Sequence, residues 1–208
     1  MLFQTLDEKN ECIAVFSDNQ LIWNKIPENL SKTWNYSAFL KNKTDIDYAF
    51  LYCAGKTLDE ACPEHLQKKW SQAFGRLRAY HRSFIEAKIN LNENCFFELV
   101  PQKFLIEYCK AKNEITEHIL NSTNKPENYE FLVEATKMLT EIKYQKLNID
   151  TSPLNKKAYS VRVRDFIKKL KKVQPYVRYN LFGSVTGRLT IEKGAFPLLN
   201  LNKNYGSI

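Results

Sequence analysis

The sequence has no long apolar run and few residues that interrupt regular structure. No stretch approaches the roughly 18–20 consecutive apolar residues that span a bilayer. Residues Met1 to Glu8 contain neither the basic nor the apolar segment of a signal peptide. Six glycines and seven prolines among 208 residues exclude collagen-like and low-complexity proteins. With 44% hydrophobic and 13% aromatic residues, we expect one globular domain or two small ones, soluble, cytoplasmic and without a membrane partner.

Cysteine and histidine are also scarce. The five cysteines are an odd number and include no Cys-x-x-Cys pair, which favours buried free thiols in a reducing compartment. Cys62 and His65 have the spacing of metal ligands, but no second pair follows at the distance of a zinc site, so no metal site is expected. His81 and His118 are interpreted as ordinary helix residues.

Acidic residues are nearly absent from the last part of the chain. Residues 151–208 contain 12 lysines and arginines but only Asp165 and Glu192, a net charge of +10. Residues 1–150 contain 19 basic and 21 acidic residues. The overall charge of +8 therefore comes entirely from one end, which indicates a polyanionic partner such as nucleic acid. A solvated basic face is the alternative.

The pattern of apolar residues predicts an α+β fold that is mainly α. A β-hairpin is predicted over 11–23, a short helix over 31–40 and a buried strand over 48–53. Thr57 and Glu60 have the spacing of a capping box. Helices are then expected from Pro63 to about 89, from Pro101 to about 120 and from Pro126 to about 147. In the last of these, the residues predicted to face inward are Phe131, Ala135, Met138, Leu139 and Ile142.

A fourth helix, predicted over 157–174, is both amphipathic and strongly basic. Its apolar stripe consists of Val163, Phe166, Ile167, Leu170 and Val173. The remaining surface carries Arg162, Arg164, Lys168, Lys169, Lys171 and Lys172. Such a helix can dock on its own protein and offer cations outward. A membrane-surface helix is a weaker alternative, because the stripe lacks the bulky tryptophan and leucine content of interfacial helices.

A short loop between apolar segments follows this helix. Residues 179–189 read Y-N-L-F-G-S-V-T-G-R-L, and the two glycines, Gly183 and Gly187, allow a tight turn and a close approach to a ligand. Ser184 to Thr190 resembles the T-x-T-G-R-L-S-S motif that opens the palm of family A DNA polymerases, and Tyr179 lies at a matching distance. Pro197 and Leu199 fit the P-N-L-Q-N stretch of that family, but its asparagine and glutamine are not in place.

The resemblance implies a divergent, phage-type polymerase, in the cytoplasm of a bacterial host. It assigns residues 1–95 to a reduced exonuclease-like region, 96–175 to a helical thumb and 176–208 to the start of the palm. Arg188 would read the minor groove at the primer terminus, with Thr186 and Gly187 shaping its loop. The basic helix would hold phosphates of primer-template DNA, with an affinity that depends on salt.

The carboxylates that such a polymerase needs are missing from these 208 residues. In the family, the carboxylates that hold two Mg²⁺ ions and the helix that binds deoxynucleoside triphosphates come after T-G-R-L. The only acid after Arg188 is Glu192, which is too close to match, and no Asp-x-Glu of an exonuclease occurs. Asp45 and Asp47 are interpreted as a strand entry. We therefore expect an N-terminal part of a polymerase, with no catalytic or metal-binding residue of its own and inactive alone. Mg²⁺ and triphosphates would bind only the complete enzyme.

The alternative is a non-enzymatic DNA-binding module that assists replication. The reading frame downstream of Ile208 separates the two, since only the first predicts continuation into an aspartate-containing palm.

Overall fold

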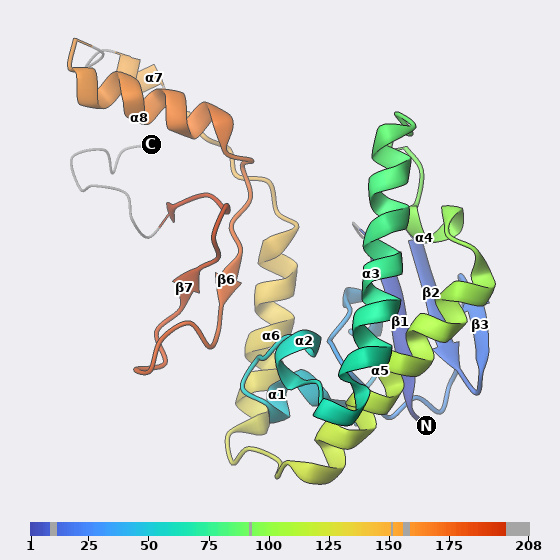
Figure 1. Ribbon diagram of the computed structural model, residues 1–208. Coiled ribbons are helices and arrows are strands. Elements are labelled where there is room, and N and C mark those ends of the chain that lie inside the picture. The colour runs from blue at the N-terminus through green and yellow to red at the C-terminus, as the bar shows by residue number, and fades with distance from the viewer. Residues whose placement is uncertain (9–11, 92, 151, 156–158, 199–208) are drawn as a thin grey trace. The chain divides into compact units, whose positions relative to one another are not determined.

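The computed structural model describes residues 1–208 except 9–11, 92, 151, 156–158 and 199–208. The chain forms two compact units, Met1–Val133 (unit 1) and Glu134–Ile208 (unit 2), and each is described by itself. The fold is α+β and mainly α, as predicted, with an N-terminal antiparallel sheet followed by long helices (Figure 1). The predicted division into regions 1–95, 96–175 and 176–208 concerns function rather than compactness, and stays a prediction.

Unit 1 begins with a three-stranded antiparallel sheet, β1 (Phe3–Glu8), β2 (Cys12–Ser17) and β3 (Gln20–Trp23). The predicted hairpin is confirmed as β2 and β3, which pair from Ser17 with Gln20 to Ala14 with Trp23. Asp18 and Asn19 both have positive φ angles, 48° and 62°, which match the right-handed twist of the paired strands. Aspartate and asparagine tolerate this conformation better than most residues.

Two short parallel strands follow, β4 (Lys32–Thr33) and β5 (Asp47–Tyr48). A parallel bridge between Leu2 and Lys32 joins them to the edge of the first sheet at β1. The helix predicted over 31–40 is therefore wrong, except for one 3₁₀ turn, η1 (Ala38–Leu40). Residues 32–33 form a strand because they pair with residues 47–48 and with Leu2, which are distant in the sequence. Asp47 does enter a strand, as expected.

The strand predicted over 48–53 is also wrong. Tyr48 ends β5, and the next four residues form a helical turn, α1 (Ala49–Tyr52). An apolar run of six residues satisfies a buried strand and a buried helix equally, and periodicity cannot separate them. Ala49 and Leu51 are both fully buried within unit 1, so the turn keeps the burial that the apolar run predicts.

The helices of unit 1 are α2 (Leu58–Ala61), α3 (Glu64–Glu86), α4 (Phe96–Leu99) and α5 (Gln102–Ser122). The capping box before α2 is confirmed, since the Thr57 side chain accepts from the Glu60 N–H and the Glu60 carboxylate accepts from the Thr57 N–H. Pro63 and Pro101 stand directly before α3 and α5. A proline there costs no helical hydrogen bond, which explains why both predicted starts are correct.

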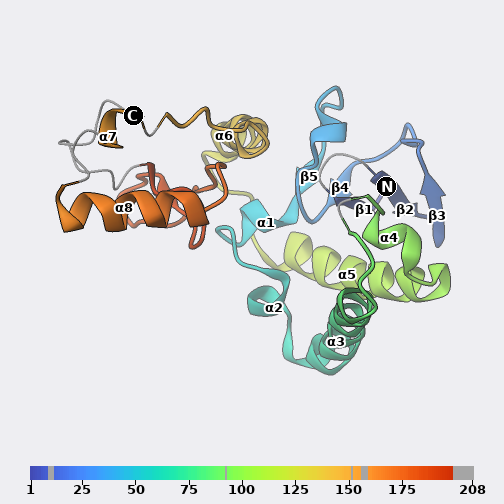
Figure 2. The same ribbon diagram turned by 90° about the horizontal axis from the view of Figure 1, so that it is seen from above.

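Unit 1 is layered, with α5 packed on the sheet and α3 packed on α5 (Figure 2). Phe16 of the sheet and Phe104, Leu105 and Ile115 of α5 are almost completely buried. Trp70 of α3 stacks on Phe74, with ring centroids 5.5 Å apart. The core thus joins all three layers.

Gly75 lies in the middle of α3, and an added Cβ would meet no atom within 4 Å. Glycine inside a helix costs about 0.5–1 kcal/mol relative to alanine, because its unfolded backbone has more freedom to lose. Gly75→Ala is therefore expected to raise the free energy of unfolding of unit 1 by about that amount. Urea unfolding followed by tryptophan fluorescence measures it, and a loss of stability would contradict the open environment of Gly75.

The cysteines depart in part from the expectation of free thiols. Cys53, Cys62 and Cys109 are free, as predicted, but Cys95 is disulfide-bonded. Burial raises the pKa of the Cys109 thiol to about 12. That thiol therefore stays protonated at neutral pH and is a poor nucleophile.

The helix α6 (Tyr129–Lys143) crosses from unit 1 into unit 2. Its buried residues are Tyr129 and Leu132. Phe131 is 66% exposed and Met138 50% exposed, so the prediction that both face inward is wrong. Helical spacing identifies the apolar residues of a helix, but which stripe is covered depends on the neighbouring elements.

Unit 2 also contains α7 (Ser152–Asn155), α8 (Val161–Lys172) and a small antiparallel hairpin, β6 (Tyr179–Asn180) with β7 (Thr190–Ile191). The fourth helix is confirmed and is shorter than predicted. The hydrophobic core of unit 2 consists of Leu154, Val163, Ile167, Leu170, Val177 and Phe196. Within the described ranges, no helix is long and apolar enough to cross a membrane.

Candidate nucleic-acid interface

The helix α8 is anchored in unit 2 by one apolar face. Val163, Ile167 and Leu170 are 5–8% exposed and pack with Val177 and Phe196. At about 100° per residue, the three helix residues fall within roughly 60° of arc. Phe166 and Val173 are half-buried at the edge of the same core, so the predicted apolar stripe is confirmed.

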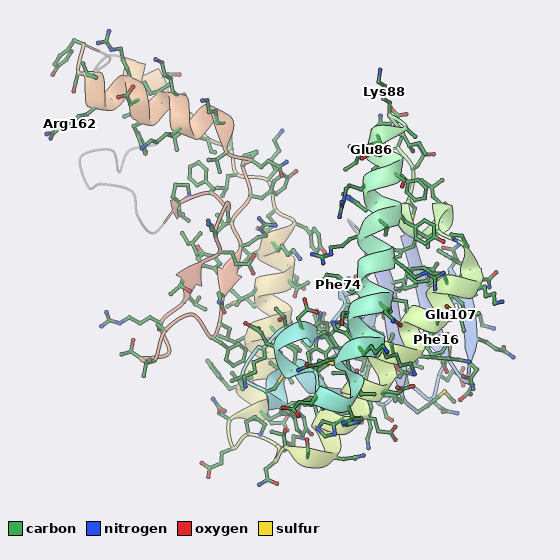
Figure 3. The ribbon with its side chains drawn as sticks, viewed as in Figure 1. Phe16, Phe74, Glu86, Lys88, Glu107 and Arg162 are labelled. Carbon is green, nitrogen blue, oxygen red and sulfur yellow. The ribbon has the colours of Figure 1, made fainter. Side chains whose placement is uncertain are left out.

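The cations of α8 cover the rest of its circumference. Arg162, Arg164, Lys168, Lys169 and Lys172 are all exposed. Figure 3 shows Arg162 extending outward from the helix. Lys171 lies in the same helix, but its side chain is not among those that the structure describes.

The exposed cations of α8 have no acidic partner in the part of unit 2 that is described. No carboxylate of the described residues lies within 4.0 Å of Arg162, Lys168 or Lys172, and the same holds for Arg164 and Lys169. The helix carries six cations and a single acid, Asp165. Five unpaired and solvated cations on a fixed scaffold form a surface that attracts polyanions.

The hairpin that follows α8 is held by backbone bonds and one ion pair. The Glu192 N–H donates to the Arg178 carbonyl oxygen at 2.9 Å, and the Phe196 N–H donates to that of Tyr176 at 3.0 Å. The Arg178 Nε lies 3.5 Å from the Glu192 Oε2. Arg178 is therefore neutralised by a neighbour, whereas Arg188 has no such partner among the described residues.

Both glycines of the loop have a structural reason, and the two reasons differ. A Cβ on Gly183 would lie 1.7 Å from the Thr190 Oγ1, so only glycine allows the two arms of the hairpin to approach this closely. The sequence predicts that Gly183 lets the backbone approach a ligand. In the structure, Gly183 instead lets the backbone approach Thr190 of the same chain. Gly187 has a φ of 69°, a left-handed conformation that favours glycine.

Ser184 closes the loop between the glycines. Its hydroxyl accepts from the Arg188 N–H and donates to the Arg188 carbonyl oxygen, both at 2.8 Å. The Gly187 N–H donates to the Ser184 carbonyl oxygen at 3.3 Å. The Ser184 hydroxyl therefore fixes the backbone of the loop at Arg188.

The predicted DNA-binding residues of the loop all face solvent. Thr186, Gly187 and Arg188 are exposed, and no described residue forms a side-chain hydrogen bond or ion pair with the Arg188 guanidinium. Val185 at the loop tip is fully exposed. Pro197 is half-buried, and Leu199 lies outside the described residues. The structure thus brings the arginine loop and the basic helix into one unit.

A second candidate is a shallow groove of about 450 Å³ between α3 and α5. It is lined by His65, Leu66, Glu114, Glu117, His118, Asn121 and Ser122. The rings of His65 and His118 meet edge to face, with centroids 5.7 Å apart. His118 therefore has a histidine neighbour from α3, which the sequence did not predict. The described residues contain no group of three or more histidine, cysteine or acidic side chains with the geometry to hold a metal.

A third candidate is a buried polar cluster between β1 and α5. The Gln4 Nε2 donates to the Asn113 Oδ1 and to the Thr116 Oγ1, both at 2.9 Å. Burial lowers the pKa of the neighbouring Lys112 ammonium, an effect that the nearby Asp7 partly offsets. Asp7 itself accepts from the Ser37 hydroxyl at 3.0 Å. The cluster ties the first strand to α5 and gathers no pair of carboxylates that faces solvent among the described residues.

The chain matches no family model, no curated protein and no solved structure. Its function must therefore be inferred from the geometry of unit 2 and from the motif in its loop.

Proposed function

We propose that this chain is the DNA-gripping part of a family A DNA polymerase and that unit 2 binds primer-template DNA. The observation that carries the proposal is the row of unpaired cations on α8, held outward by a buried apolar face. The resemblance of Ser184 to Thr190 to the T-G-R-L motif supplies the polymerase half of the proposal.

The length of the cationic face suits the DNA backbone. From Arg162 to Lys172 the helix rises about 15 Å, since each residue adds about 1.5 Å. Along the axis of B-DNA, one strand carries a phosphate about every 3.4 Å, so a face of this length covers the axial rise of about four phosphates. Contacts of this kind hold any sequence equally well, as a replicating enzyme requires.

The Arg188 loop suits a different task. Minor-groove acceptors are common to all base pairs, and an arginine fork reaches two adjacent acceptors. Arg188 is exposed at the end of a hairpin whose turn is fixed by Ser184 and Gly187. A fixed backbone with an exposed guanidinium fits a groove reader. Mg²⁺ and deoxynucleoside triphosphates would bind the complete polymerase.

The direct test is equilibrium binding of the chain to a primer-template duplex in increasing salt. We expect binding without sequence preference and a linear fall of log affinity with log salt. An affinity that does not change with salt, or a strong preference for one sequence, would contradict the proposal.

Arg188→Ala is expected to weaken binding of primer-template DNA by about 1–3 kcal/mol with little change in the salt slope. The reason is that groove acceptors carry no condensed counterions, unlike phosphates. Arg188→Lys is the matched control, because it keeps the charge and loses the fork. If Arg188→Lys binds as tightly as the unchanged chain, the arginine contacts a phosphate and the groove assignment is wrong.

A further inference from the structure

Tyr159 is 86% exposed, directly before the cationic helix α8. It is the most exposed of the described aromatic side chains, ahead of Phe131 at 66% and Tyr144 at 38%. No described ring stacks on it, and no described group hydrogen-bonds its hydroxyl. A single exposed aromatic is ordinary on a protein surface, so its meaning depends on what surrounds it.

Val161 is the second apolar residue at this end of α8, and it is 62% exposed. On the helical wheel it lies about 150° from the centre of the three buried residues, on the same side as Lys168 and Lys172. Apolar side chains of α8 otherwise face the core of unit 2. Val161 therefore places apolar surface on the cationic side of α8, and the exposed ring of Tyr159 stands two residues before it in the chain.

An aromatic ring next to a row of cations is the arrangement that holds single-stranded nucleic acid. The cations follow the backbone, and the ring stacks on a base. In a duplex the faces of the bases are already stacked on one another, so an unpaired base is the fitting ligand. A lipid surface fits less well, because the apolar stripe of α8 is buried in unit 2 and cannot enter a bilayer.

We propose that Tyr159, together with the nearby Val161, is a stacking platform for an unpaired base of single-stranded DNA at the N-terminal end of the cationic face of α8. This inference rests on the proposed function and adds that the N-terminal end of α8 binds the single-stranded part of the DNA. In a primer-template junction the unpaired strand is the template overhang.

The experiment measures binding of the full chain to three probes at one salt concentration: a blunt duplex, the same duplex with an unpaired 5′ overhang, and the single strand alone. We expect the overhang probe to bind more tightly than the blunt duplex. Tyr159→Ala should weaken binding of the overhang and single-strand probes by about 5- to 150-fold. Its salt slope should stay unchanged, since the residue carries no charge.

Two matched variants separate stacking from other effects. Tyr159→Phe keeps the ring and should bind as the unchanged chain does, whereas Phe131→Ala removes an exposed ring from α6 and should have no effect. Photocrosslinking of a single strand that contains 5-iododeoxyuridine should label Tyr159 directly, which tests contact even if a variant folds poorly.

The outcomes distinguish the two proposals. If no probe binds, the proposed function fails together with this inference. If the blunt duplex binds with the expected salt dependence while Tyr159→Ala matches the unchanged chain, only the stacking platform is wrong. Loss of binding in Tyr159→Phe would assign the effect to the hydroxyl and overturn stacking. Sedimentation with vesicles that contain acidic lipid is the fourth measurement: if Tyr159→Ala loses binding to these vesicles but not to DNA, the residue belongs to a membrane surface and the platform is overturned.

Discussion

Replacing Lys168, Lys169, Lys171 and Lys172 with alanine is expected to lower the affinity for primer-template DNA by up to about three orders of magnitude near 0.1 M salt. Removing one phosphate-binding cation should reduce the log–log salt slope by about 0.9, so the slope should fall by up to about 3.6. The described members of this set are exposed and unpaired, so their removal breaks no ion pair among the described residues. Alanine also favours the helix, which leaves the scaffold intact.

The control for this variant removes the same charge from a different surface. Lys32, Lys41, Lys103 and Lys110 are exposed lysines of unit 1, and none forms an ion pair with a described residue. Their fourfold replacement by alanine should leave most of the salt slope in place. Equal losses in both variants would mean that DNA responds to net charge alone. An unchanged slope in the α8 variant, with normal circular dichroism, would mean that the basic face is merely solvated.

Phe196→Ala is expected to destabilise unit 2 by about 3–5 kcal/mol, the usual loss for a buried aromatic side chain. Phe196 is 2% exposed and packs with Ile167 and Leu170 of α8, so its removal leaves a cavity beneath the basic helix. For a unit of this size, such a loss is a large fraction of the total stability. We expect α8 to lose its ordered docking and DNA binding to fall with it.

Hydrogen exchange of the α8 amides measures this effect. Tryptophan fluorescence cannot, because the three tryptophans, Trp23, Trp34 and Trp70, all belong to unit 1. Tryptophan fluorescence then reports unit 1 separately and should not change. Leu198→Ala is the control, since Leu198 is 40% exposed and should shift stability by no more than about 0.5 kcal/mol. Unchanged protection of α8 in Phe196→Ala would show that this core does not hold the helix.

The correct predictions from sequence concern features whose cause is local. The Thr57–Glu60 capping box, the starts of α3 and α5 after prolines, and the tight turn at Asp18 and Asn19 each depend on neighbouring residues. The wrong ones concern segments whose partners are distant. Residues 32–33 become a strand because they pair with residues 47–48, and the apolar run at 48–53 becomes helical for a reason that its own pattern does not contain.

The candidate site divides in the same way. The amphipathic pattern of 161–172 identifies a basic helix with one buried face, because helical periodicity is a property of the sequence alone. The sequence does not show that the cations lack acidic partners among the described residues, because carboxylates distant in sequence can fold back onto them. Nor does it show the exposure of Tyr159, which depends on what covers the segment before α8.

Residue order alone accounts for the charge asymmetry, the mainly α composition of the fold, the amphipathic basic helix and the T-G-R-L loop. These features follow from composition and helical spacing, which need no tertiary partner. The folded chain was needed to show that Gly183 serves packing against Thr190, and that Arg178 is neutralised by Glu192 while Arg188 is exposed. It was also needed to show that α6 leaves Phe131 exposed. The physical reason is that burial and pairing depend on which surfaces meet, and residues distant in sequence supply those surfaces.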